Sequence, residues 1–165
     1  MKNSYLISYL IYIRDKLIKD NKTLGISESC TGGYLSYLFT FLPNSSKIFK
    51  GSVVVYTNEI KGKVLKVDKQ ILEQYGAISE ETSINMAKNV KEILNVDYSI
   101  GVTGNLGPVS QEKKDKGLIY VSIFLKDKLI SKKFILSGTR EEIRQKLVYN
   151  IIYLFYNLIK KEQIS

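Results

Sequence analysis

The chain has 165 residues, 44% of them apolar, and a formal charge of +9. This is enough for one sizeable hydrophobic core and too little for two full domains, so we expect residues 1–165 to form a single domain. The one cysteine, Cys30, excludes an intramolecular disulfide and a multi-thiol zinc site, which favours a reducing, cytoplasmic location. The charge is weak support for nucleic-acid binding, because 22 of the 25 basic residues are scattered lysines and base recognition favours arginine.

Helical and strand-like patterns alternate along the chain, as in an α/β layered fold. The apolar run 4–13 has no cleavage site after it and continues into charged residues, so it predicts an amphipathic helix and no signal peptide. Its inward stripe consists of Leu6, Leu10, Ile13 and Leu17. Residues 23–27 predict a short strand, and the turn 29–33 leads into a second helix that ends before Pro43. The apolar run 149–159 is too short to span a bilayer, so no membrane segment is expected.

The middle of the chain continues this alternation. The β-branched run Val53–Tyr56 suits a buried strand, and two short helices are expected around 59–66 and 68–75. Residues 97–102 predict the next strand. That strand leads into 103–108, where two glycines and a proline indicate a loop.

Two further helix starts carry capping signals. Ser79 can cap a helix that begins at Glu80, and the inward stripe of that helix consists of Met86, Val90 and Ile93. Thr139 and Glu142 form a capping box. The last helix then has an apolar stripe made of Ile143, Leu147, Ile151, Leu154 and Leu158.

Between these helices, Leu118–Leu125 and Leu129–Leu136 predict an antiparallel hairpin joined by a short polar turn. The whole pattern predicts a three-layer α/β/α sandwich. Its sheet is expected to be mixed and mainly parallel, with the hairpin in the C-terminal half of the chain.

The chain contains no histidine. This excludes Ser-His-Asp and Cys-His catalysis and a histidine-ligated catalytic metal, so a general base must be Lys, Asp, Glu or Tyr. A serine or threonine nucleophile with a lysine base is the leading arrangement for acyl chemistry.

Ser29 is expected where a strand ends and a helix begins, the edge at which parallel sheets present ligands. The backbone amides of Thr31, Gly32 and Gly33 could hold an oxyanion or a phosphate there. The same pattern fits an ordinary helix cap and a glycine turn equally well. Cys30 is another conceivable nucleophile, although its surroundings are more typical of a small buried packing residue.

Tyr56, Asn58 and Lys61 follow the valine-rich strand, and their spacing lets a strand end and a first helical turn converge on one pocket. Taken alone, this pattern is uninformative, because a lysine near a helix start is ordinarily a solvated surface charge.

Six ordered segments carry a resemblance to a known family. They are Glu28–Gly33, Phe49–Lys61, Tyr75–Glu81, Val102–Gly104 with Gly107–Pro108, Gly117, and Gly138–Arg144. From about Leu6 onward the chain resembles the CinA C-terminal domain family, in a stand-alone form without the larger N-terminal domain of many members. The resemblance implies an α/β sandwich and a nicotinamide-nucleotide amidase. This enzyme hydrolyses the carboxamide of nicotinamide mononucleotide to nicotinate mononucleotide and ammonia.

By motif position, the resemblance assigns the nucleophile to Ser29 and the base to Lys61. Tyr56 is the third catalytic residue, and the Ser29 proton is expected to reach Lys61 directly or through it. It places Asn58, Thr103 and Gly104 in the substrate pocket and Arg140 at the substrate phosphate, and it implies no cofactor and no metal. The expected partner is therefore a small nucleotide, with no specific nucleic acid and no membrane. The oligomeric state is left open, a homodimer included.

The segment after Gly107–Pro108 departs from the family pattern. Residues 109–117 stand where the family usually has a glycine-rich stretch followed by Lys-Pro-Val-Gly. Since this loop is expected to border the substrate, reduced activity or altered specificity would follow. The main alternative is therefore a weak or inactive member that serves as a binding or regulatory protein linked to competence or DNA damage. A nucleic-acid binder is the second alternative, supported by the charge.

Overall fold

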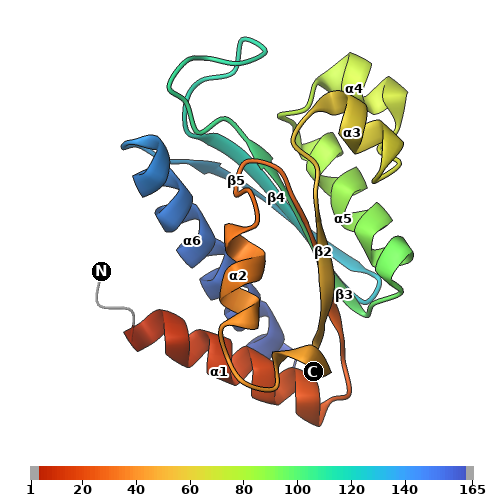
Figure 1. Ribbon diagram of the computed structural model, residues 1–165, viewed down its shortest axis with the longest axis vertical. Helices are drawn as coiled ribbons and strands as arrows, with labels where there is room; N and C mark the ends of the chain where they lie inside the picture. Colours follow the sequence, from red (N-terminus) through yellow and green to blue (C-terminus); the bar gives the residue numbers. More distant parts are fainter. Residues whose placement is uncertain (1–3, 163–165) are drawn as a thin grey trace.

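The computed structural model describes residues 4–162 and places a five-stranded sheet between two helical layers (Figure 1). The strands are β1 (Leu24–Glu28), β2 (Phe49–Val54), β3 (Tyr98–Gly104), β4 (Leu118–Leu125) and β5 (Lys128–Ile135). Their order in the sheet is β2-β1-β3-β4-β5. Strand β1 pairs in parallel with β2 and β3, whereas β4 is antiparallel to β3 and to β5. This confirms the predicted mixed α/β sandwich with a C-terminal hairpin.

Three helices cover each face of the sheet. On one face lie α1 (Ser4–Lys19), α2 (Tyr34–Thr40) and α6 (Arg140–Lys161), and on the other lie α3 (Asn58–Lys63), α4 (Lys69–Tyr75) and α5 (Glu80–Leu94) (Figure 1). A single 3-10 turn, η1 (Ser45–Lys47), precedes β2. The amphipathic stripes explain this arrangement, because each long helix turns its apolar side toward the sheet.

The hydrophobic core has two parts, one on each side of the sheet. The larger part packs α1, α2 and α6 against β1, β3 and β4, with Ile13, Ile100 and Phe155 fully buried. The smaller part includes Leu65 and Met86 and joins α5 to the segment around α3. A Cβ atom added at Gly101 of β3 would lie 2.4 Å from the Ser83 carbonyl oxygen, so glycine is what lets α5 pack this closely.

Most of the predicted helix features are confirmed. The four apolar residues predicted on α1 are all buried. Ser79 caps α5 by accepting a hydrogen bond from the Thr82 amide, and Thr139 and Glu142 form both halves of the capping box on α6. The part of the chain described here contains no helix that is long and apolar enough to cross a membrane.

Two packing predictions were wrong. The run Val53–Tyr56 does not form a buried strand, because β2 begins at Phe49, ends at Val54 and lies at the edge of the sheet. Val55, which follows the strand, is the fully buried residue. On α5, Ile93 is 49% exposed, because the neighbouring Leu94 packs against β1 over Gly25 in its place.

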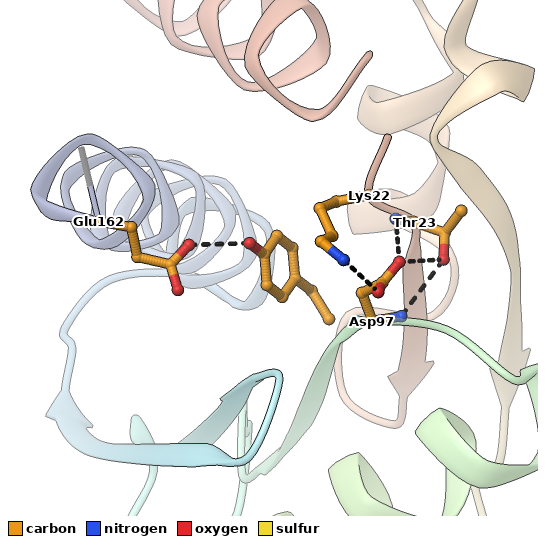
Figure 2. Close-up of polar contacts among 5 residues, drawn as sticks. Lys22, Thr23, Asp97 and Glu162 are labelled. Carbon is orange, nitrogen blue, oxygen red and sulfur yellow. Dashed lines mark hydrogen bonds and ion pairs between the residues drawn. The ribbon is translucent and has the colours of Figure 1, made fainter. Parts of the chain in front are cut away.

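The beginning of β1 is fixed by Asp97, the residue before β3 (Figure 2). Its carboxylate accepts hydrogen bonds from Lys22 Nζ at 2.9 Å, from the Thr23 amide at 2.9 Å and from the Thr23 hydroxyl at 3.1 Å. Nearby, the Tyr98 hydroxyl donates to Glu162 at 2.8 Å and so ties the end of α6 to β3. The two central parallel strands are therefore anchored together at their amino ends, opposite the edge where Ser29 lies.

Candidate active site

A cavity of about 370 Å³ opens at the carboxyl ends of β1 and β3. Its walls come from the turn after β1, the start of α3, the segment before α5, the end of β3 with its following loop, and the first residue of α6. The lining residues are Ser29, Cys30, Tyr56, Thr57, Asn58, Lys61, Ala77, Ile78, Thr103, Gly104, Leu106, Gln111, Glu112 and Arg140. The predicted residues Ser29, Tyr56, Asn58, Lys61, Thr103, Gly104 and Arg140 therefore meet at one cavity.

Ser29 stands directly after β1 and is 6% exposed. Its amide donates to the Val102 carbonyl at 3.1 Å, which extends the β1–β3 ladder by one residue before the chain turns. The turn closes with a hydrogen bond from the Gly32 amide to the Ser29 carbonyl. Gly32 and Gly33 have φ angles of +61° and +94°, a left-handed conformation that glycine adopts without strain.

Lys61 lies on α3, and only 1% of its surface is exposed. Thr57 caps this helix by accepting a hydrogen bond from the Ile60 amide, so Lys61 falls on the turn that faces the sheet. Its Nζ atom lies 3.1 Å from Ser29 Oγ, 3.1 Å from the Val55 carbonyl oxygen and 3.2 Å from the Tyr56 carbonyl oxygen.

These three contacts can be made by either form of the amine. The two carbonyl oxygens can only accept hydrogen bonds, whereas Ser29 Oγ can accept one from the Lys61 ammonium or donate one to the neutral amine. In the neutral form, the lone pair of Lys61 is left for the Ser29 hydroxyl. Burial lowers the pKa of Lys61 below the ordinary value of 10.5, partly opposed by Cys30 and Glu112. None of the ion pairs found between residues 4 and 162 involves Lys61.

Cys30 also lines the cavity, but it is less suited to be a nucleophile. Burial raises the pKa of its thiol to about 12, opposed in part by its own backbone N–H and by the nearby Lys61. The thiol therefore stays protonated at neutral pH, and the thiolate is the reactive form.

Tyr56 and Arg140 form a pair at the mouth of the cavity. The Arg140 guanidinium donates to the Tyr56 hydroxyl at 2.7 Å and to the Gly107 carbonyl at 2.5 Å. Tyr56 is 61% exposed, and it meets Lys61 through its backbone carbonyl and not through its hydroxyl. Arg140 thus links the start of α6 to the loop after β3 and retains further N–H groups for an anion.

Thr103 and Asn58 reach the cavity in different ways. The buried Thr103 hydroxyl donates to the Ala77 carbonyl at 2.7 Å, which joins the end of β3 to the segment before α5. Asn58, the first residue of α3, is exposed at the cavity wall. Gly104 is the last residue of β3 and lines the same wall.

The remaining predicted residues lie beside the cavity without lining it. The Gly32 amide is bonded to Ser29, and the Gly33 amide donates to the Glu28 carboxylate at 3.0 Å. Thr31 is buried, and its hydroxyl oxygen has no hydrogen-bond partner among the residues that the structure describes. The two glycine amides named from the sequence are thus already engaged within the turn.

Two carboxylates were not singled out from the sequence. Glu28 is fully buried and accepts hydrogen bonds from the first turn of α2. Glu112, in the loop 105–117, lines the cavity and accepts from the Ala77 and Ile78 amides at 3.2 and 3.3 Å. Glu28 stands six positions before the first residue of α2, outside the usual capping positions, so no local signal identifies its contacts. Glu112 carries no local signal either, because its contacts depend on how the loop folds back.

The family model of the CinA C-terminal domain matches residues 10–159. A CinA-like protein from Petrotoga mobilis is 37% identical over 155 residues, which cover 93% of this chain and 38% of that protein. A CinA-like protein from Endomicrobium trichonymphae is 44% identical over 133 residues, covering 80% of this chain and 31% of that protein. The chain therefore spans only about a third of the length of these relatives.

Solved structures agree with this assignment. A competence-damaged protein (CinA) superfamily protein from Enterobacter cloacae superposes with a TM-score of 0.89 at 25% identity, covering 92% of this chain and 90% of the other. The corresponding superfamily protein from Escherichia coli gives a TM-score of 0.86 at 28% identity, covering 92% and 87%. From the matched segment, the relatives and the shared fold, we conclude that this chain belongs to the CinA C-terminal domain family.

Proposed function

We propose that the protein is an amidohydrolase that removes ammonia from nicotinamide mononucleotide and releases nicotinate mononucleotide. The observation that carries the proposal is the contact between the buried Lys61 amine and the Ser29 hydroxyl, with two carbonyl oxygens also within hydrogen-bond distance of the amine. This arrangement supplies a nucleophile and a base for acyl transfer in a chain without histidine.

In the first half of the reaction, Ser29 Oγ attacks the carboxamide carbon while its proton moves to Lys61 Nζ. The carbonyl oxygen becomes an oxyanion, which backbone N–H groups of the turn after Ser29 stabilise. When this intermediate collapses, the C–N bond breaks and the Lys61 ammonium gives its proton to the leaving nitrogen. Ammonia departs, and an ester joins the pyridine carbonyl to Ser29.

In the second half, a water molecule attacks the ester and gives a proton to neutral Lys61. Collapse of the second tetrahedral intermediate returns that proton to Ser29 Oγ and releases the carboxylate product. Lys61 thus acts as base and then as acid in each half, so its pKa has to lie well below that of a free lysine. The Arg140 guanidinium, at the cavity mouth, is the group we assign to the substrate phosphate.

The test is a paired measurement of ammonia and nicotinate mononucleotide formed by purified protein from nicotinamide mononucleotide. We expect equal amounts of the two products, and at least an approximately 1,000-fold loss of kcat in Ser29→Ala. Ser46→Ala, at an exposed position in η1, is the matched control and should keep the wild-type rate.

Two results would contradict the proposal in different ways. An unchanged rate in Ser29→Ala would rule out the nucleophile. A wild-type protein that binds the nucleotide without releasing ammonia would favour the alternative of an inactive binding member. The loop 105–117, which brings Gln111 and Glu112 into the cavity wall, is the feature that favours this alternative.

A further inference from the structure

Glu28 is a fully buried carboxylate next to the proposed nucleophile. One of its oxygens accepts hydrogen bonds from the Gly33 amide at 3.0 Å and the Leu35 amide at 3.2 Å. The other accepts from the Ser36 amide at 2.9 Å and from the Ser36 hydroxyl. No ion pair in the described part of the chain involves Glu28, so its partners there are the N–H groups of the turn and of α2 and the Ser36 hydroxyl.

These bonds fix both sides of the nucleophile turn. The backbone of Glu28 is held in the centre of the sheet, where it pairs with Val54 of β2 and Val102 of β3. Its side chain at the same time holds the first turn of α2. The segment between, which contains Ser29, is thereby closed into a ring from the Glu28 backbone to the Gly33 amide and back to the Glu28 carboxylate.

The same bonds decide which amides remain for a substrate. Glu28 occupies the N–H groups of Gly33, Leu35 and Ser36, and the Gly32 amide is bonded to the Ser29 carbonyl. Within the turn, the N–H groups of Cys30 and Thr31 are left. Neither donates to another residue in the part of the chain described, and the Cys30 N–H contacts only its own sulfur. Cys30 lines the cavity and Thr31 lies beside it, so these are the N–H groups of the turn that remain for an oxygen developing charge beside Ser29.

We propose that Glu28 is a positioning residue for the amidase reaction. It holds Ser29 Oγ within reach of Lys61 and commits the amides of α2, so that the Cys30 and Thr31 amides receive the oxyanion. The inference rests on the proposed function. To that function it adds the group that fixes the nucleophile and the donors that remain for the intermediate.

Glu28→Gln is the main test because it keeps the size of the side chain. Its amide group retains one oxygen but turns an NH₂ group toward backbone N–H donors, which loosens the turn. Since a displacement of about 1 Å costs roughly 100-fold in rate, we expect kcat to fall about 10- to 100-fold. KM should change less than about 3-fold, because Glu28 does not line the cavity. The pH profile should fall in height and keep its position, because Lys61 retains its surroundings.

Asp97→Asn is the matched control for a merely structural effect. Asp97 also accepts several hydrogen bonds and also holds β1, but it does so at the opposite end of the strand. This variant should lose thermal stability and keep the wild-type kcat per folded molecule. Ser36→Ala leaves the backbone bonds to Glu28 in place and removes one donor, so it should fold and lose about 2- to 5-fold in kcat. It carries the test if Glu28→Gln does not fold.

A second measurement separates this inference from the proposed function. A fluorophosphonate reacts with an activated serine whatever the natural substrate, so its labelling rate reports on Ser29 directly. We expect labelling to slow in Glu28→Gln as much as kcat does. If the fluorophosphonate labels wild-type protein and Glu28→Gln at the same rate, only the role of Glu28 is overturned. Wild-type protein that neither labels nor turns over would overturn the nucleophile and this inference with it.

Discussion

The side-chain nitrogen of Lys61 lies 3.1 Å from the hydroxyl oxygen of Ser29, although the two residues are 32 positions apart in the sequence. Strands β1 and β2 bring them together, because they are parallel neighbours and end at the same edge of the sheet. Ser29 follows β1, and Lys61 follows β2 on the short helix α3. Burial of the amine then adjusts its proton affinity for the chemistry that the contact allows.

The first prediction concerns the pH dependence of Lys61. The neutral amine is the active base, so kcat/KM should rise as the pH passes through the lowered pKa of Lys61. It should reach its plateau below pH 10.5. The Lys61→Met variant should be at least about 1,000-fold less active than the wild type at every pH. The measurement is the pH profile of ammonia release by the two proteins. Activity that is highest in acid and falls as Lys61 loses its proton would contradict a base role.

The same pKa shift predicts a difference in stability. Between the lowered pKa and 10.5, the unfolded chain binds more protons at Lys61 than the folded protein does, so this residue makes stability rise with pH. Lys61→Met lacks that contribution, and thermal melts of both proteins across this range should show a smaller slope for the variant. Identical slopes would mean that Lys61 is charged in the folded protein.

The second prediction separates Tyr56 from Arg140. Lys61 contacts the carbonyl of Tyr56, so Tyr56→Phe keeps this bond and should lower kcat less than about 5-fold. Arg140→Gln removes the guanidinium from the cavity mouth and should raise KM for the nucleotide about 10- to 100-fold, the usual range for a charged hydrogen bond. Steady-state kinetics of both variants check this. A collapse of kcat in Tyr56→Phe would instead make the hydroxyl part of the proton transfer.

The third prediction concerns the contact between Glu112 and the segment before α5. A Cβ atom added at Gly76 would lie 2.5 Å from Glu112 Oε2, and the φ angle of Gly76 is +80°. Gly76→Ala should therefore cost about 1–3 kcal/mol of stability and displace the Glu112 side chain. Hydrogen exchange at the Ala77 and Ile78 amides should become faster, as it should in Glu112→Ala. Unchanged protection in both variants would show that Glu112 does not hold the loop in solution.

The fourth prediction concerns acid stability. Desolvation raises the pKa of Asp97, but the hydrogen bonds from Lys22 and Thr23 outweigh it, so the pKa lies below 3.8. Asp97 therefore makes its full contribution to stability above pH 3.8, and this contribution is lost as the pH falls through the lowered pKa. Asp97→Asn should cost about 1–3 kcal/mol at neutral pH, with a smaller difference in acid. Denaturant unfolding at several pH values tests this, with Asp127→Asn in the exposed β4–β5 turn as the control.

The local sequence predicts much of this fold. Capping at Ser79 and Thr139 depends on residues within one helical turn, so it can be read directly from the chain. The edge position of β2 cannot be predicted in this way, because the Val53–Tyr56 run has the same sequence whether the strand pairs with one neighbour or with two. Likewise, the exposure of Ile93 depends on Leu94 finding space above Gly25 in a distant strand.

The candidate site, too, is predicted only in part by the local sequence. The absence of histidine favours Ser29 with a lysine base, but on base rates Lys61 is a surface charge. Its burial follows from the placement of α3 against the end of β1, which no local pattern contains. The engagement of the Gly33 amide by Glu28 was also hidden, because it depends on the turn folding back on its own strand.

The most direct test of the Ser29–Lys61 mechanism is to trap the acyl-enzyme. Protein mixed with nicotinamide mononucleotide is quenched in acid within the first turnover, digested and mapped by mass spectrometry. We predict that the peptide containing Ser29 gains the mass of the nicotinate mononucleotide acyl group on the serine, and that Ser29→Ala gives neither adduct nor ammonia. An adduct on Cys30, or wild-type ammonia release by Ser29→Ala, would contradict the account.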